Sequence, residues 1–491
     1  MKSFTGIIEI NVGGTVGQEI NAKGFKTDDF TRFHQKLTLE TQYLNALIEQ
    51  KKLSESPLTA GFEIEAWLID DSMLAAPNNV SFLQQLNDPL AFPELAKFNI
   101  ELNSVPQRLA NTVLSTLHKN LQTTWEKACR QAKELDNHLL IIGTLPTLKP
   151  TDMSLKNMSE MNRYQVLNEQ ILKARGKPIN LDIVGVEHLK FDHYDVMLES
   201  ATTSLQLHTQ VPLHSAHHYY NASIIASAAM VASCANAPYL FAKDLWHESR
   251  IPLFEQAIET GGYGGAIHGP LRRVSFGSAY ARSSIMECFT ENLQHFPVLL
   301  PELFTESVEK FEHLRLHNGT IWRWNRPLIG FDEDDTPHIR IKHRTPSAGP
   351  TIIDTIANAA FYYGLTKDLC DEITGQSIPL AFNHAKDNFY QAARFGLDSQ
   401  IVWFDGEKHN LQKLILSDLL PRARKGLQSL HINAQDIATY LGIIEQRIAN
   451  KQTGSQWQRQ FMQQADASLQ SMTEAYLDLQ YSEVPVSRWE T

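Results

Sequence analysis

Four short segments of the chain alternate apolar with polar residues, a pattern typical of β-strands. Residues two apart in a strand point to the same side, so each segment has one apolar and one polar face. The polar faces consist of Glu63 and Glu65 in 61–67, Asn99, Glu101 and Asn103 in 98–103, Ser204, Gln206, His208 and Gln210 in 204–210, and His338, Arg340, Lys342 and Arg344 in 338–344. On the opposite faces we expect Ile64, Ile100 and Leu207 to be buried against helices.

Helical periodicity dominates both ends of the chain. Two sets of apolar residues are spaced as on one helix face, namely Phe33, Leu37 and Leu44, and Ile437, Leu441, Ile444 and Ile448. Asn433 is the expected N-cap of the second helix, and Gly454 its expected end. A hairpin at 401–409, turned by Asp405-Gly406, interrupts the helical pattern.

The order of the elements predicts an α+β fold. Strands and helices between about 58 and 355 do not succeed one another as βαβ units, which favours a mainly antiparallel sheet. We expect three regions: an N-terminal lead and helix at 1–50, a core at 51–355, and a mostly helical region at 356–491. With 491 residues, 43% of them hydrophobic, the chain can bury a large core.

Composition excludes several classes of protein. The net charge is -11 and no dense Lys/Arg run occurs, so nucleic acid is not an expected partner. Residues 1–20 lack the pattern of a signal peptide, and the apolar stretch 222–242 is interrupted by serines, an asparagine and a proline, so it predicts a buried helix rather than a membrane span. The four cysteines are scattered without a CxxC pair, which suits a soluble protein of the reducing cytoplasm.

The four polar faces allow two interpretations. Any one strand could simply have a solvated face. Taken together, however, one face is acidic, one is basic and two carry amides and a histidine. Glu63, Glu65, Glu101 and His208 suit a hard divalent cation such as Mg²⁺ or Mn²⁺, and the cationic strand suits phosphate oxygens. The pattern therefore favours a site for a metal–nucleotide complex.

Other cofactor motifs do not compete with this interpretation. The sequence has no GxGxxG after a strand and no GxxxxGK[ST] loop. The glycines around Tyr263, in 261–265, are interpreted as a substrate-side loop, with a plain structural turn as the alternative. Arg272 and Arg273, which follow this loop, could bind a substrate carboxylate.

Several motifs resemble the glutamate–cysteine ligase family, within the carboxylate–amine ligase and glutamine-synthetase-like superfamily. They are GFEIEAWLID, PELAKFNIELN, TTSLQLHTQVP and the stretch from IWRWNRPLIGFD to HIRIKHRTPSAGP, in family order between about 58 and 365. The resemblance implies a curved antiparallel sheet that forms a funnel, in which ATP and divalent metals drive formation of a γ-glutamyl phosphate that the amine of cysteine attacks. It also implies a role in glutathione biosynthesis.

The resemblance assigns roles to individual residues. The sheet carboxylates and the metal-proximal histidine fall on Glu63, Glu65, Glu101 and His208. Arginines that match the family pattern are Arg163, Arg250, Arg340 and Arg344. Trp322, Trp324 and Asn325 occupy a segment that could border the nucleotide, with packing at a strand–loop junction as the alternative. We expect Arg340, Arg344 and Lys342 to stabilise the moving phosphoryl group. We expect Arg250 or Arg273 to bind the carboxylate of the acceptor.

Lys342 departs from the family pattern, which has a glutamate at this position. An ammonium about 4 Å from a divalent ion would be repelled by roughly 8 kcal/mol at an effective dielectric constant of about 20. Lys342 could replace a metal and touch phosphate, swing away, or mark a site that has lost activity. Three hypotheses therefore stay open: a glutamate–cysteine ligase, a ligase with another amine or acid, and a degenerate binding protein. Assembly into homo-oligomers also stays open.

Overall fold

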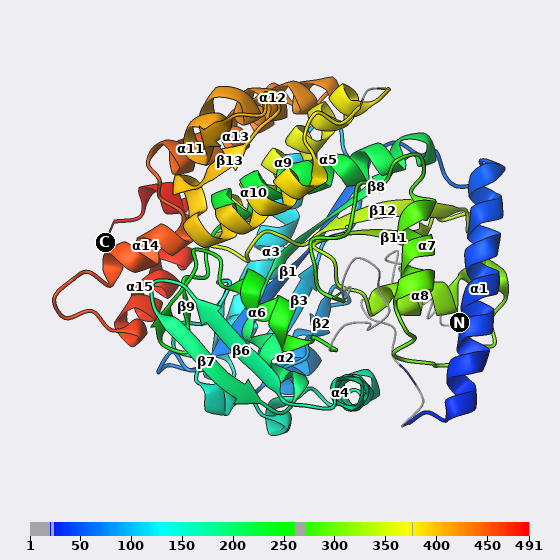
Figure 1. The fold of residues 1–491 in the computed structure, drawn as a ribbon. Helices are drawn as coiled ribbons and strands as arrows, with labels where there is room; N and C mark the ends of the chain where they lie inside the picture. Colours follow the sequence, from blue (N-terminus) through cyan, green and yellow to red (C-terminus); the bar gives the residue numbers. More distant parts are fainter. Residues whose placement is uncertain (1–19, 21–23, 261–271, 376, 491) are drawn as a thin grey trace, which may run out of the picture.

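The computed structural model describes residues 20, 24–260, 272–375 and 377–490. Within these residues the centre of the fold is an eight-stranded sheet in the order β11-β12-β8-β1-β3-β2, with β4 and β5 also paired to β1 (Figure 1). Every pairing in it is antiparallel. The strands are β1 Thr59–Ile69, β2 Ala91–Pro93, β3 Asn99–Asn103, β4 Gln107–Arg108, β5 His138–Leu140, β8 Leu205–Val211, β11 Asn325–Phe331 and β12 Pro337–His343.

Smaller sheets and helices surround this sheet. The smaller strands are β6 Ile179–Val184 with β7 His188–His193, β9 Tyr239–Leu240 with β10 Lys243–Asp244, and β13 Gln400–Val402 with β14 Lys408–Asn410. The α-helices are α1 Thr27–Glu49, α2 Asn79–Leu86, α3 Val113–Lys133, α4 Asn162–Arg175, α5 Ala216–Ser233, α6 Arg250–Ala257, α7 Met286–His295, α8 Glu312–Gly319, α9 Ile352–Ile373, α10 Phe382–Phe395, α11 Leu411–Leu414, α12 Leu420–Ser429, α13 Ala434–Ala449, α14 Gly454–Phe461 and α15 Leu469–Tyr481. Short 3₁₀ helices include η3 Val196–Ala201.

The apolar faces of the strands form the core, as predicted. Ile64, Ile100 and Leu207 have no exposed surface. Helices α5 and α9 contact the sheet, and the hydroxyl of Tyr363 in α9 donates a hydrogen bond to the carbonyl of Gly61 in β1, 2.8 Å away. The strands therefore have the predicted orientation, and their polar faces turn toward the opposite side.

The helical layer packs on α9. In Figure 1, α12 and α13 lie beyond α9, away from the sheet. Helices α9 and α12 approach closely, because a Cβ atom built on Gly426 would lie 2.0 Å from the carbonyl oxygen of Gly364. Arg447 of α13 forms an ion pair of 2.7 Å with Asp354 of α9, and both side chains are buried. The C-terminal helices thus join the core through close packing and a buried charge pair.

Several local predictions are confirmed and two are corrected. The N-terminal helix, the helix capped by Asn433 and the hairpin turned by Asp405-Gly406 are present as α1, α13 and β13–β14. Gly454 does not end a helix: α13 ends at Ala449 and Gly454 begins α14, where a side chain would collide with Asn236. The apolar stretch 222–242 is buried up to Phe241, but its helix α5 ends at Ser233 and the chain continues into β9. No helix in the described part of the chain is long and apolar enough to cross a membrane.

Candidate active site

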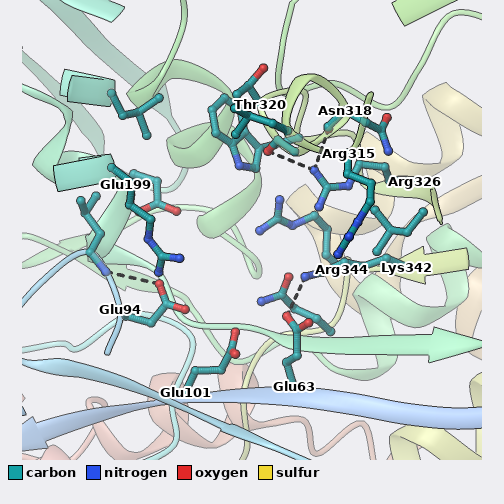
Figure 2. A pocket seen from close by; sticks show the side chains of 18 of the residues that line it. Glu63, Glu94, Glu101, Glu199, Arg315, Asn318, Thr320, Arg326, Lys342 and Arg344 are labelled. Carbon is teal, nitrogen blue, oxygen red and sulfur yellow. Dashed lines mark hydrogen bonds and ion pairs between the residues drawn. The ribbon is translucent and has the colours of Figure 1, made fainter. Parts of the chain in front are cut away.

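A cavity of about 280 Å³ lies on the polar face of the sheet. Its floor comes from β1, β3, β8, β11 and β12, and its walls from α4, η3, α8 and the loops around them. Figure 2 shows Glu94, Glu101 and Glu199 on one side and the labelled arginines with Lys342 on the other, with Glu63 next to Lys342. The charged and polar lining residues are Glu63, Glu65, Glu94, Glu101, Glu199, Arg163, Arg315, Arg326, Arg340, Arg344, Lys342, His208, Gln206, Asn318 and Thr320. Most of the charged residues on the polar faces of the strands therefore line the floor of a cavity rather than a solvated surface.

Three carboxylates of the acidic side converge. Glu65 on β1 lies directly opposite Glu101 on β3, and Glu94 precedes β3 on the adjoining loop. One carboxylate oxygen from each of the three lies within 4.8 Å of the other two. Glu65 accepts hydrogen bonds from Ser204 and Gln206, which fix its position. Hard oxygen ligands in this arrangement could hold Mg²⁺ or Mn²⁺.

Burial and mutual repulsion raise the pKa values of the carboxylates on the acidic side. Burial, followed by the charge of Glu94, raises the pKa of Glu65 to about 7. Burial and the charges of Glu63 and Glu94 raise the pKa of Glu101 well above its usual value. Burial and the neighbouring carboxylates also raise the pKa of Glu199, to about 8. Buried like charges disfavour the ionised form, so these carboxylates favour binding of a cation.

Glu63 has a different environment from the other carboxylates. The ammonium of Lys342 lies 2.6 Å from one of its oxygens, and Nε2 of His208 lies 3.1 Å from the other. Lys342 on β12 is directly opposite His208 on β8, so adjacent strands supply both partners. Burial raises the pKa of Glu63, but Lys342 and His208 more than offset this and hold it well below its usual value. Glu63 is therefore an ionised carboxylate with its countercharge inside the protein.

The basic side carries four arginines in addition to Lys342. Arg326 on β11 is directly opposite Lys342, and its guanidinium donates to the carbonyls of Asn318 and Ile321. Burial lowers the pKa of Arg326 to about 9 and that of Arg340 to about 10, so both remain cationic at neutral pH. Fixed guanidinium groups of this kind suit phosphate oxygens.

The remaining wall is largely apolar. Arg163 and Tyr164 of α4 reach the cavity, and a guanidinium nitrogen of Arg163 lies 2.7 Å from the Tyr164 hydroxyl. The apolar lining includes Leu95, Leu167, Val196, Ile258, Leu300, Leu316, Trp322, Leu328 and Ile329. The cavity thus combines a charged floor with an apolar wall that could contact the uncharged part of a ligand.

Nine residues predicted from the sequence line this cavity together. They are Glu63, Glu65, Glu101, His208, Arg163, Arg340, Lys342, Arg344 and Trp322. Arg340 and Arg344 come from β12 and the residue that follows it, and Arg344 also lies over the ring of Phe254. The alternation of polar residues along the strands therefore brought most of the candidate residues to one place.

Two residues of the Trp-Asn segment lie in the core instead. The indole nitrogen of Trp324 donates to Glu255, and its ring packs against Phe254. Asn325 donates to Ser227 and lies 2.7 Å from Nδ1 of His343. Their expected role beside a nucleotide is corrected to packing at the strand–loop junction.

The residues expected to bind substrate carboxylates are also placed elsewhere. Arg273 is buried and donates to backbone carbonyls of Thr320 and Pro297, so it holds loops together. Arg272 is an exposed partner of Glu259. Tyr263 lies outside the described residues.

Arg250 lies close to the cavity but outside its lining. It forms an ion pair of 3.2 Å with Glu248 and donates to the carbonyl of Thr345. A small void joins its side chain to Glu65, Glu199 and Arg344. Arg250 can therefore support the charged floor from behind, and its contact with a substrate carboxylate stays a prediction.

Four charged residues of the cavity were not identified from the sequence. Glu94 lies in the quoted motif PELAKFNIELN but precedes the strand, and Glu199 belongs to η3, where no strand alternation marks it. Arg315 lies on α8. Arg326 could have been found from the hairpin of β11 and β12, because it lies directly opposite Lys342.

Comparisons with known proteins agree with this fold. A solved glutamate–cysteine ligase of Francisella tularensis in complex with AMP is similar with a TM-score of 0.51 at 10% identity, covering 89% of this chain and 89% of that chain. This likeness and the strand pairing confirm the predicted curved antiparallel sheet.

Two further structures are less similar. A bifunctional glutathione synthetase of Pasteurella multocida has a TM-score of 0.46 at 12% identity, over 90% of this chain and 55% of that one. The ligase PafA in complex with the ubiquitin-like protein Pup has a TM-score of 0.39 at 9% identity, over 90% and 78%.

The similarity to a known family covers more of the chain than the motifs between about 58 and 365. Among curated proteins no sequence matches this chain. The family model described as glutamate-cysteine ligase family 2 (GCS2) matches residues 59–482, which includes most of the C-terminal helical layer. The chain therefore belongs to glutamate–cysteine ligase family 2 and is a ligase.

Proposed function

We propose that this ligase uses ATP to convert the γ-carboxylate of glutamate into an acyl phosphate and couples it to the amine of cysteine. The observation that carries the proposal is the pairing of converging carboxylates with fixed cations across one buried cavity. In a cell, the γ-glutamylcysteine formed would enter glutathione biosynthesis in the cytoplasm.

The carboxylate cluster fits a divalent cation. Glu65, Glu94 and Glu101 would hold Mg²⁺ or Mn²⁺, and their mutual repulsion in a buried site favours such an ion. When bound, the ion neutralises part of the negative charge of the triphosphate.

The cationic side acts on the phosphoryl group. Phosphoryl transfer needs positioning and charge stabilisation more than covalent help from the protein. Arg340, Arg326 and Lys342 come from two paired strands, so their positions are fixed before ATP enters. They would hold the terminal phosphate near the glutamate carboxylate and stabilise the charge that develops during transfer. Arg344, at the end of β12, would act with them.

Burial protects the product of this step. An acyl phosphate is lost if water reaches it before the amine does. The cavity floor is buried, and the apolar wall around Leu167, Val196 and Leu300 limits access of water. The amine attacks the acyl carbon, the C–N bond forms, and phosphate leaves with the electrons of the C–O bond.

An acceptor other than cysteine is the second candidate. The apolar wall favours an amine that carries an uncharged side chain, but it does not distinguish a thiol from an alkyl group. A third possibility, a degenerate binding protein, predicts binding of ATP without turnover.

Release of ADP tests these candidates. The chain is incubated with ATP, Mg²⁺ and glutamate, and a panel of amines is screened with and without cysteine. Release that depends on cysteine supports the proposal, and release with a different amine supports the second candidate. A folded chain that binds ATP but releases no ADP with any amine contradicts ligase function.

A further inference from the structure

Lys342 occupies a fixed position in the middle of the charged floor. It lies on β12 between Arg326 of β11 and His208 of β8, directly opposite both. Its side chain is buried, with 11% of its surface exposed, and it points across β8 to Glu63 on β1. Because three strands hold the lysine, the histidine and the glutamate, this contact belongs to the framework of the sheet.

Both oxygens of Glu63 lie close to nitrogen atoms. Oε2 accepts a hydrogen bond from the Lys342 ammonium at 2.6 Å, and Oε1 lies 3.1 Å from His208. A divalent cation on Glu63 would have to displace the ammonium or sit beside it, and like charges at such a distance repel strongly in a buried site. Glu63 therefore has a cation built into the protein.

Among the described residues, the neighbouring carboxylates Glu65 and Glu101 accept hydrogen bonds from neutral groups and not from an ammonium. Glu65 accepts hydrogen bonds from the neutral groups of Ser204 and Gln206, and Glu101 accepts one from the amide of Asn103. Together with Glu94 they form the converging cluster described above, which does not include Glu63. The floor thus contains one carboxylate in contact with an ammonium and a cluster of three carboxylates close enough together to share a cation.

We infer that Lys342 takes the place of a divalent cation at Glu63. The chain then holds one divalent cation, at Glu65, Glu94 and Glu101, and presents the ammonium of Lys342 directly to the phosphates of the nucleotide. This inference rests on the proposed function for the identity of the nucleotide. The number of cations bound to the protein alone does not depend on turnover.

The test is a count of bound Mn²⁺. Titration of the full chain with Mn²⁺ alone, followed by electron paramagnetic resonance of the free ion, should give one tight site per chain. Lys342→Met removes the charge but keeps the length of the side chain, so Glu63 becomes available and the count should rise to two. In Lys342→Met/Glu63→Gln the second ligand is removed, and the count should return to one.

A lysine on the protein surface provides the matched control. Lys310 pairs with Asp335 on the surface, so Lys310→Met should leave the count at one. Two tight sites in the wild-type chain, or an unchanged count in a folded Lys342→Met chain, would overturn the inference. If Lys342→Met does not fold, the wild-type count decides alone: one supports the inference and two overturns it.

Failure of this inference is distinguishable from failure of the proposed function. A count that changes from one to two in a chain without ligase activity supports the built-in cation and contradicts the ligase. Active enzyme with two wild-type sites supports the ligase and contradicts the built-in cation.

Discussion

Two buried ion pairs in this protein have similar geometry and different surroundings. Arg447 and Asp354, in the helical layer, are 2.7 Å apart, and Lys342 and Glu63, in the cavity, are 2.6 Å apart. The first pair is enclosed by the fold: Arg447 also donates to the carbonyl of Ser233, and Asp354 accepts from Thr351 and Val486. It joins α9, α13 and the end of the chain.

The second pair is only partly enclosed by the fold. Burial lowers the pKa of Lys342, the charge of Glu63 opposes this shift, and the pair borders a cavity that can admit a ligand. Burial and distance alone therefore do not distinguish a structural ion pair from one in a binding site. The difference lies in the surroundings: the fold encloses the first pair, whereas the second borders a cavity lined by further carboxylates and arginines.

Breaking the closed pair should have the largest effect. Arg447→Met leaves Asp354 buried without its countercharge, and we expect a loss of about 3–5 kcal/mol in the free energy of unfolding. Urea denaturation measures this loss. The surface pair of Lys451 and Asp398 provides the control, since Lys451→Met should cost no more than about 1 kcal/mol. Equal effects of the two substitutions would show that the buried pair does not hold the layer.

Breaking the cavity pair should cost less. Lys342→Met also leaves a carboxylate without its countercharge, but Glu63 can take water, a proton or a metal ion from the cavity. We expect a loss of about 1–2 kcal/mol, less than for a fully enclosed pair. Thermal denaturation with and without Mn²⁺ checks this, and Mn²⁺ should restore part of the loss. A loss as large as that for Arg447→Met, unaffected by Mn²⁺, would contradict the distinction between the two pairs.

Removing one carboxylate of the cluster should stabilise the metal-free protein. The pKa of Glu101 is raised in the folded state, so ionisation of this group opposes folding as the pH rises above its unfolded value. At pH 8, Glu101→Gln should therefore increase the free energy of unfolding, because it removes a buried charge from the carboxylate cluster. Near pH 4.5 the gain should disappear. A loss of stability at pH 8 would contradict the proposed repulsion.

The smallest expected effect is the pH dependence of stabilisation by Mg²⁺. Protons and the cation compete for Glu65, whose pKa is raised to about 7. Mg²⁺ should therefore raise the melting temperature by more at pH 8 than at pH 6, and by little in Glu101→Gln at either pH. An equal increase in the melting temperature of the wild type at pH 6 and pH 8 would indicate that Mg²⁺ binds elsewhere.

The sequence predicted which face of the sheet each residue occupies better than it predicted which residues on a face contact one another. Alternation along single strands identified Glu63, Glu101 and Lys342 as residues of one cavity, because the period of two is a local property of a strand. The pairing of Lys342 with Glu63 depends on the order and register of β12, β8 and β1, which alternation within one strand does not contain.

Residues outside the strands were harder to predict. Glu94 and Glu199 reach the cavity from a loop and from a 3₁₀ helix, and Arg315 from α8. Conversely, Arg273 and Trp324 have the residue types of a binding site but satisfy buried groups of the protein. Residue type indicates a capacity for chemistry, whereas the fold decides whether a ligand or the protein uses it.

Trapping of the acyl phosphate with hydroxylamine tests the central claim most directly. Hydroxylamine replaces the amine in a reaction with ATP, Mg²⁺ and glutamate, and both γ-glutamyl hydroxamate and ADP are measured. The wild type should form them in equal amounts, and Glu101→Gln should form neither while remaining folded. A folded wild-type chain that binds ATP and forms no hydroxamate, or a Glu101→Gln chain that forms it at the wild-type rate, would contradict the assignment of this cavity as the site of carboxylate activation.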